Sequence, residues 1–337
     1  MRHPLWKLLA GSAIALALTA AAPAEPVKLK LAFFSSDRTN VYEAAIKPFV
    51  ENFNADAQGL AEIEVYFSGA LGKAQQQQAQ LVLDGVADIA FVVPGMTPDL
   101  FRDNAVIELP GLFHNLREAT LTYTRLTAAN VIKGYEDFFV IGAFGSDLES
   151  IHTRPAISSL GDLKGKKIRA NNQTEAAALT KLGMVPVVMP VNAISEKISR
   201  GDIDGAAVPP SMLFEFGIAR VATYHYFLRI SSAPMALLMN RKSFEALPER
   251  VQEIVRKHSG EEAAERYIAN REALENQVMA QLKADARRKV IFPSQRDLDI
   301  ADATFTAVTE QAIASNPRLG DLLKAARSEI AKLRAPE

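Results

Sequence analysis

Residues 161–210 constrain the fold of this chain more than any other segment, because short apolar runs alternate with helical periodicity there. The segment reads GDLKGKKIRANNQTEAAALTKLGMVPVVMPVNAISEKISRGDIDGAAVPP and predicts strand, helix, strand, helix and strand in that order. Strands and helices that alternate over short connections are typical of a parallel sheet with helices on its faces. We therefore expect an α/β fold.

The N-terminal part of the chain predicts the same order of elements. Strands are expected at residues 28–34, 61–67 and 88–93, with helices at 40–54 and 73–83 between them. Two such units in 337 residues predict two lobes with a cleft between them. Ligands of open parallel sheets bind beyond the carboxyl ends of the strands, so the residues that follow each strand are candidates for binding.

The C-terminal third of the chain is predicted to be almost entirely helical. Residues 243–289 keep helical spacing over a length unusual for one helix. Either Pro248 and Gly260 divide this stretch, or one long helix spans both lobes. Residues 297–315 and 318–333 predict two closing helices.

The first 24 residues have the features of an export signal. A basic start, MRHPLWK, precedes the apolar run LLAGSAIALALTAAA, and Ala22-Pro23-Ala24 fits a small-x-small cleavage site. The apolar run is short for a membrane span, and an uncleaved N-terminal anchor is the alternative. The chain has no cysteine, which excludes disulfides and lipoprotein attachment. We expect a soluble exported protein, periplasmic if the source is a Gram-negative bacterium.

Composition and motifs argue against several classes of function. The net charge of −1 gives no basic face for a nucleic acid. The histidines have no metal-ligand spacing, and the sequence contains neither a phosphate-binding loop nor a nucleophile elbow. We therefore predict no cofactor, no metal site and no catalytic residues. An exported enzyme acting on a carboxylate stays open as an alternative.

Arg169 is the strongest candidate for a binding residue. It ends the first strand of the 161–210 segment and is followed by Asn171, Asn172 and a helical run over 175–182. A guanidinium offers a bidentate fork, and a helix N-terminus adds free N–H groups and a positive partial charge. This combination predicts a site for a carboxylate.

Six segments in a fixed order carry a resemblance to a known family. They are EVYFSGALGKAQQQQAQLVLDGVADIAFV (64–93), AVIELPGLFHN (105–115), SSLGDLKGKKIRA (158–170), LGMVPVVMP (182–190), GDIDGAAVPP (201–210) and ALLMNRKSFEALPERVQEIV (236–255). In order and spacing they resemble the substrate-binding subunit of tripartite ATP-independent periplasmic (TRAP) transporters, of the dicarboxylate-binding-protein (DctP) type. The resemblance covers nearly all of the chain beyond the export signal.

The resemblance implies a two-lobed periplasmic binding protein fold. Each lobe would be a mostly parallel sheet flanked by helices, with a long helix spanning both lobes. We expect residues 27–148 and 237–277 in the first lobe, residues 149–236 and 278–320 in the second, and a C-terminal helix over 321–337. The family further implies hinge closure on an organic acid, which is handed to membrane permease subunits driven by an ion gradient. We expect a monomer.

The same resemblance suggests which residues contact the ligand. Arg169 in LKGKKIR matches the arginine that clamps carboxylates in the family, with Asn171 as a helper. Val208 stands where the family often has an asparagine that contacts ligand, and Val93 and Phe34 occupy strand ends where polar side chains are frequent. A second arginine, present in some members between residues 145 and 153, is absent here.

These departures predict an apolar pocket. A buried polar group without a partner costs roughly 1–3 kcal/mol, so a pocket lined by Phe34, Val93 and Val208 would reject a hydroxyl-rich ligand. We expect a monocarboxylate with an aromatic or branched apolar tail, on which Phe33 or Phe34 stacks.

Three alternatives stay open at this point. Arg229 is either a replacement cation or a structural ion-pair partner, and a C4-dicarboxylate or a sugar acid is an alternative ligand. The third alternative is a binding protein that reports its ligand to a sensor kinase.

Overall fold

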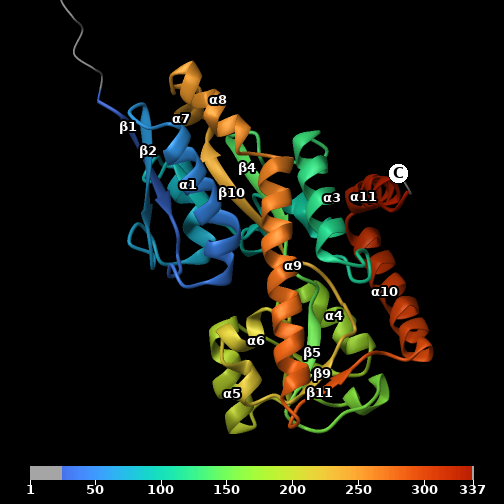
Figure 1. Ribbon diagram of the computed structural model, residues 1–337. Helices are drawn as coiled ribbons and strands as arrows, with labels where there is room; N and C mark the ends of the chain where they lie inside the picture. Colours follow the sequence, from blue (N-terminus) through green and yellow to red (C-terminus); the bar gives the residue numbers. More distant parts are fainter. Residues whose placement is uncertain (1–24, 336–337) are drawn as a thin grey trace, which may run out of the picture.

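Two β-sheets, one in each lobe, form the framework of the computed structural model, which describes residues 25–335 (Figure 1). The predicted export signal lies outside the described residues. The sheet of the first lobe has the order β2-β1-β3-β10-β4. Its strands are β1 (Val27–Ala32), β2 (Ala61–Tyr66), β3 (Ile89–Val92), β4 (Phe138–Gly145) and β10 (Pro234–Asn240).

The sheet of the second lobe has the order β11-β9-β5-β8-β6-β7. Its strands are β5 (Ser150–Thr153), β6 (Lys167–Ala170), β7 (Val185–Val188), β8 (Gly205–Val208), β9 (Tyr224–Tyr226) and β11 (Lys289–Ile291). Helices α4 (Gln173–Lys181) and α5 (Ile194–Arg200) connect β6, β7 and β8, so the predicted β-α-β-α-β order of residues 161–210 is confirmed. The prediction of a two-lobed α/β fold is confirmed as well.

Both sheets combine parallel and antiparallel pairs. The strands linked by crossover helices pair in parallel, as β1 does with β2 and β3, and β6 does with β7 and β8. The antiparallel pairs are those of β10 in the first sheet and of β5 in the second. The strand β5 follows the segment that crosses from the first lobe to the second, and β10 follows the segment that crosses back. Because each of these strands enters its sheet from the other lobe, it runs opposite to its neighbours.

The two crossing segments run side by side and form a hinge. Ser146 donates its backbone N–H to the carbonyl of Ala233 at 2.9 Å, and Glu149 donates to Ser231 at 2.9 Å. The return bond runs from the N–H of Ile230 to the carbonyl of Glu149 at 2.8 Å. Residues 146–149 and 230–233 therefore continue the antiparallel pairing of β4 with β10 into the second lobe.

In the first lobe, helices cover the sheet as the helical periodicity predicts. A short π-helical turn (Tyr42–Ile46) precedes α1 (Lys47–Asp56), and a 3₁₀ turn (Gln75–Gln77) precedes α2 (Gln78–Leu83). Another helix, α3 (Leu116–Ala128), packs against β4.

The long helical stretch meets both sequence-based expectations at once. After the short α7 (Arg241–Glu245), Pro248 precedes α8 (Glu249–Lys257) and Gly260 precedes α9 (Glu261–Ala284). Gly260 has a φ of +66°, a conformation that favours glycine. After this break, α9 packs Tyr267 and Ile268 into the core of the first lobe and Val278 and Leu282 into that of the second. It runs along both lobes (Figure 1).

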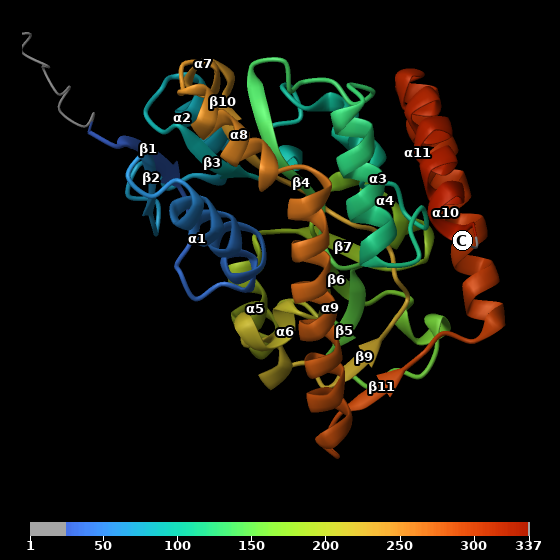
Figure 2. The same cartoon turned by 45° about the horizontal axis from the view of Figure 1, so that its top comes forward.

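The two closing helices also connect the lobes. The helix α10 (Gln295–Ser315) packs on α4 of the second lobe through Phe305 and Val308, which lie in the core of that lobe. The helix α11 (Arg318–Arg334) packs on α3 of the first lobe (Figure 2). The residue boundaries predicted for the lobes stay a prediction.

A pair of histidines lies inside the second sheet. His152 on β5 faces His225 on β9, with their Nδ1 atoms 3.0 Å apart, and His152 Nε2 lies 3.2 Å from the carbonyl oxygen of Val208. Both side chains are buried, and burial lowers the pKa of His225 to about 4 and holds that of His152 well below its usual range.

The histidine pair predicts acid sensitivity of the fold. The unfolded chain takes up protons near pH 6.5 that the folded chain excludes until about pH 4, so acid favours unfolding in this window. One excluded proton contributes up to about 1.4 kcal/mol per pH unit. We expect His225→Asn to lose less stability than the unmodified chain between pH 6.5 and 4.5, measured by urea unfolding.

The exposed His114 supplies the control for this experiment. His114→Asn should keep the pH dependence of the unmodified chain, because this side chain is exposed to solvent in the folded chain. Equal pH dependence in His225→Asn and the unmodified chain would contradict the assignment.

Candidate functional site

Arg169 lies at the carboxyl end of β6 and is 4% exposed. Its Nε donates to the carbonyl of Met189 at 3.0 Å, and its Nη1 donates to the carbonyl of Ala207 at 3.0 Å. Its Nη2 donates to Oδ1 of Asn171 at 3.0 Å. A guanidinium has five N–H donors, so two remain for other acceptors.

The guanidinium of Arg169 forms no direct ion pair with the part of the chain that the structure describes. Among residues 25–335, no carboxylate oxygen lies within 4.0 Å of its nitrogens, whereas the buried Arg271 is paired with Asp147. A buried charge is costly unless it is paired, and a carboxylate can accept two parallel N–H bonds from a guanidinium. The two unused donors are complementary to a carboxylate ligand.

The N-terminus of α4 is partly occupied by the chain itself. Asn172 caps the helix and accepts a hydrogen bond from the N–H of Glu175 at 2.8 Å. The Glu175 carboxylate in turn accepts from the N–H of Asn171 at 2.6 Å. The sequence suggested that the N–H groups at this helix start are free for a ligand. The capping arrangement uses one of these groups and places the Glu175 carboxylate at the helix start.

Sequence reasoning missed a cluster of three carboxyl groups beside Arg169. Glu149 and Glu175 are almost completely buried, and neither Glu149 Oε2 nor Glu175 Oε1 has a hydrogen-bond partner. Burial and the neighbouring Glu175 raise the pKa of Glu149 well above its usual range. Burial, together with Glu175, raises the pKa of the third group, Glu108, to about 7. Because Glu149 is buried beside a second carboxyl group, its protonated form is favoured.

The apolar side chains predicted for the pocket differ in exposure. Phe33 is fully buried in the core of the first lobe, edge-on to Phe91, while Phe34 beside it is partly exposed. Val93 follows β3 and is also partly exposed. Val208 ends β8 and is fully buried. Phe34 and Val93 therefore have surface that a ligand can reach.

Arg229 does not lie beside Arg169 in the small pocket that it lines. It is exposed, has a φ of +58°, and donates from Nη1 to the carbonyl of His114 at 3.2 Å. It lines a small pocket of about 60 Å³ together with Glu275, and Arg169 is not part of that lining. Of the predicted site residues, the structure brings Arg169 and Asn171 into direct contact.

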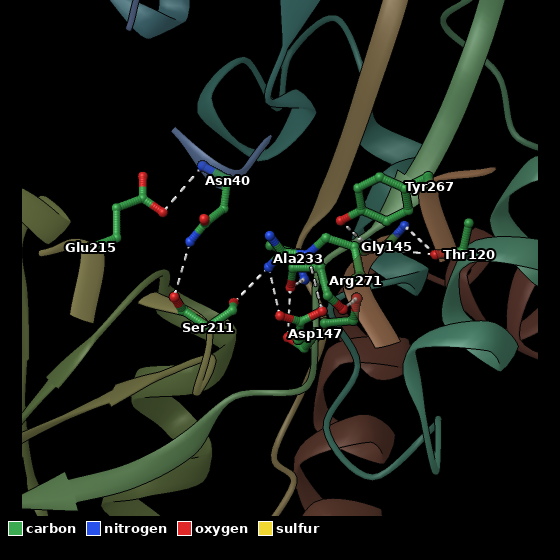
Figure 3. Close-up of polar contacts among 11 residues, drawn as sticks. Asn40, Thr120, Gly145, Asp147, Ser211, Glu215, Ala233, Tyr267 and Arg271 are labelled. Atoms are coloured by element: carbon green, nitrogen blue, oxygen red, sulfur yellow. Dashed lines mark hydrogen bonds and ion pairs between the residues drawn. The ribbon is translucent and has the colours of Figure 1, made fainter. Parts of the chain in front are cut away.

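Polar contacts join the two lobes beside the hinge (Figure 3). Asn40 of the first lobe donates from Nδ2 to the carbonyl of Ser211 at 3.2 Å, and its N–H lies 3.4 Å from the Glu215 carboxylate. Arg271 of α9 donates from Nη2 to Asp147 at 2.6 Å and to the Ser211 hydroxyl at 2.5 Å. One arginine thus joins the long helix, the hinge and the second lobe.

The family assignment rests on most of the chain. Residues 31–316 match the model of the DctP family, described as bacterial extracellular solute-binding protein, family 7. The chain belongs to this family. The resemblance to TRAP binding subunits is thereby confirmed, and this member of family 7 is a solute-binding protein of a transport system and not an enzyme.

Two curated relatives cover much of this solute-binding protein. The C4-dicarboxylate-binding periplasmic protein DctP of Rhodobacter capsulatus is 24% identical over 254 residues, which cover 73% of this chain and 75% of the relative. A solute-binding protein of Sulfitobacter sp. (strain NAS-14.1) is 23% identical over 335 residues, which cover 96% of this chain and 98% of the relative.

Solved structures of TRAP solute-binding proteins share the fold. One from a marine metagenome, specific for aromatic acid ligands and bound to metahydroxyphenylacetate, has a TM-score of 0.83 and 26% identity, and covers 92% of this chain and 100% of that chain. One from Rhodoferax ferrireducens with copurified benzoate has a TM-score of 0.81 and 24% identity, and covers 91% of this chain and 98% of that chain. Within residues 25–335, no helix of this family 7 member is long and apolar enough to cross a membrane.

Proposed function

We propose that this protein is the periplasmic binding subunit of a TRAP transporter for monocarboxylates with an aromatic or branched apolar tail. The observation that carries the proposal is the buried guanidinium of Arg169, which keeps two N–H donors and forms no ion pair within 4.0 Å among the described residues. The ligand carboxylate accepts hydrogen bonds from these two donors. Asn171 acts through its hydrogen bond to Nη2, which orients the guanidinium.

The apolar surface around the site supports a tail with few polar groups. Phe34 and Val93 follow neighbouring parallel strands of the first lobe and are both partly exposed. A hydroxyl group against these side chains would lose its hydrogen bonds with water without gaining new ones. Phe34 stacks on the tail, whereas Phe33 supports it from the core.

The comparisons support the same ligand class. The marine metagenome protein is specific for aromatic acids, and a Bordetella bronchiseptica protein with bound mandelate has a TM-score of 0.78. A glucuronate-bound protein of Roseobacter denitrificans has a TM-score of 0.75. We infer that this chain is closer in build to the aromatic-acid binders.

Binding proceeds by closure at the hinge. The lobes approach each other through contacts such as that between Asn40 and Ser211, and the ligand is buried between them. Closure removes water from the pair of Arg169 with the ligand carboxylate, which strengthens that pair. The closed form then presents the surface that the permease subunits recognise, and the ligand passes to them.

A thermal-shift screen of the purified protein tests the proposed ligand class. The panel contains benzoate, phenylacetate, branched aliphatic monocarboxylates, succinate and glucuronate. A ligand at a hundred times its dissociation constant adds about 2.7 kcal/mol of stability. We expect stabilisation by the aromatic or branched monocarboxylates. Stabilisation by succinate or glucuronate alone would overturn the proposed ligand class.

A further inference from the structure

We propose that Glu108 selects ligands with one hydrogen-bond donor, such as a hydroxyl group, at a distance from their carboxylate, and that it excludes dicarboxylates. This inference rests on the proposed function, since it assumes a monocarboxylate held by Arg169. It adds a charged residue of the first lobe to a site whose arginine comes from the second.

Glu108 lies between the two lobes. It follows a 3₁₀ turn of the first lobe (Arg102–Val106), and its Oε1 lies so close to Gly95 that a Cβ at that position would be only 2.5 Å away. On its other side it lies beside the side chain of Asn172, which caps α4 in the second lobe. Gly95 belongs to the segment after β3, where the strand order predicts ligand contacts.

Only Glu108 of the three clustered carboxyl groups is open to a ligand. It keeps partial contact with solvent, whereas Glu149 is 3% exposed and Glu175 is fully buried. The unpartnered oxygens of Glu149 and Glu175 are buried and out of reach of a ligand. Within residues 25–335, no group of three or more histidine, cysteine or acidic side chains is arranged to hold a metal ion.

The charges around Glu108 favour a hydrogen-bond donor. Glu149 and Glu175 are its acidic neighbours, and the phenol of Tyr123 also lies within electrostatic reach. Arg169 is the cation of this cluster, and the ligand carboxylate occupies it. A second carboxylate would meet the negative charge of Glu108 without a cation to balance it, whereas a hydroxyl group can donate to Glu108.

The charge on Glu108 can be varied with pH. Burial and Glu175 raise its pKa to about 7, so the carboxylate is mostly charged at pH 8 and mostly protonated at pH 6. A protonated Glu108 no longer repels a second carboxylate. We therefore expect the exclusion of dicarboxylates to be strong at pH 8 and weaker at pH 6.

Titration calorimetry with a matched set of aromatic acids tests the inference. The ligands are benzoate, 3-hydroxybenzoate, 4-hydroxybenzoate and benzene-1,3-dicarboxylate, each at pH 6 and pH 8. For the unmodified protein we expect at least one hydroxybenzoate to bind roughly tenfold more tightly than benzoate, as one charge-assisted hydrogen bond allows. The dicarboxylate should bind measurably at pH 6 only.

Two substitutions separate the roles of charge and hydrogen bonding. Glu108→Leu should abolish the preference for the hydroxybenzoate while benzoate still binds. Glu108→Gln keeps an acceptor oxygen and removes the charge, so it should admit the dicarboxylate at pH 8. Glu253→Gln changes an exposed residue of α8 and should leave every affinity unchanged.

The outcomes distinguish this inference from the proposed function. If benzoate binds but Glu108→Leu keeps the hydroxyl preference, the role of Glu108 is overturned and the proposed function stands. If no aromatic acid binds the unmodified protein, both are overturned. If Glu108→Leu fails to fold, the inference is tested by Glu108→Gln and by the pH dependence of dicarboxylate binding to the unmodified protein. An equal affinity for the dicarboxylate at pH 6 and pH 8 overturns the inference.

Discussion

Replacing Arg169 by lysine is expected to weaken binding of the carboxylate ligand at least tenfold, and replacing it by methionine roughly a hundredfold. A lysine ammonium carries the charge, but it cannot keep three hydrogen bonds within the chain and still offer two parallel donors to the ligand. Methionine removes the charge altogether. Titration calorimetry with the best ligand of the thermal-shift screen measures both effects.

Arg241 supplies a matched control for these substitutions. Like Arg169, it donates to two backbone carbonyls, those of Glu136 and Phe138, but it belongs to the outer end of the first lobe. Arg241→Lys should lower stability through the lost carbonyl contacts and leave ligand affinity unchanged. Unchanged affinity in both Arg169 variants would remove Arg169 from the site.

The substitution Arg271→Met is expected to lower the free energy of unfolding by about 3–5 kcal/mol, the usual effect of breaking a buried ion pair. The side chains of Arg271 and Asp147 are 7% and 3% exposed, and their closest N–O distance is 2.6 Å. Methionine fills similar space but leaves the Asp147 carboxylate buried without a counter-ion. Urea unfolding followed by circular dichroism measures the change.

A double variant and a surface control sharpen this test. Removing both charges in Asp147→Leu with Arg271→Met should recover much of the lost stability, because no unpaired charge stays buried. Arg117 pairs with Glu265 on the surface, so Arg117→Met should change stability by less than about 1 kcal/mol. A loss in Arg271→Met no larger than in Arg117→Met would show that the hinge pair is not a stabilising contact.

The strands and helices could be predicted because their signals are local. In the 161–210 segment, apolar runs of strand length and residues with helical spacing follow one another directly, and each element depends on its own side chains. Pro248 and Gly260 predicted breaks for the same reason, since proline lacks an N–H and glycine tolerates a positive φ. The sequence could not show that the helix would both break at these residues and span the two lobes.

The candidate site was predictable only in part. Arg169 and Asn171 are two residues apart, so the end of one strand places both. Glu108 and Glu149 come from separate parts of the chain, and nothing in their local sequence distinguishes them from exposed acids. The one local signal was the Asn-x-x-Glu spacing from Asn172 to Glu175, which is typical of a capped helix start.

The sequence by itself determined the α/β class, the two-lobed build, the family and the arginine proposed to hold the carboxylate. These depend on periodicity, on turn residues and on a motif, all of which act over short stretches of chain. Only the tertiary structure decided that Arg169 keeps two free N–H donors, that three carboxyl groups gather beside it, and that Arg271 joins the hinge to the second lobe. Burial and charge pairing depend on which distant segments meet in space, and that is set by the packing of the whole chain.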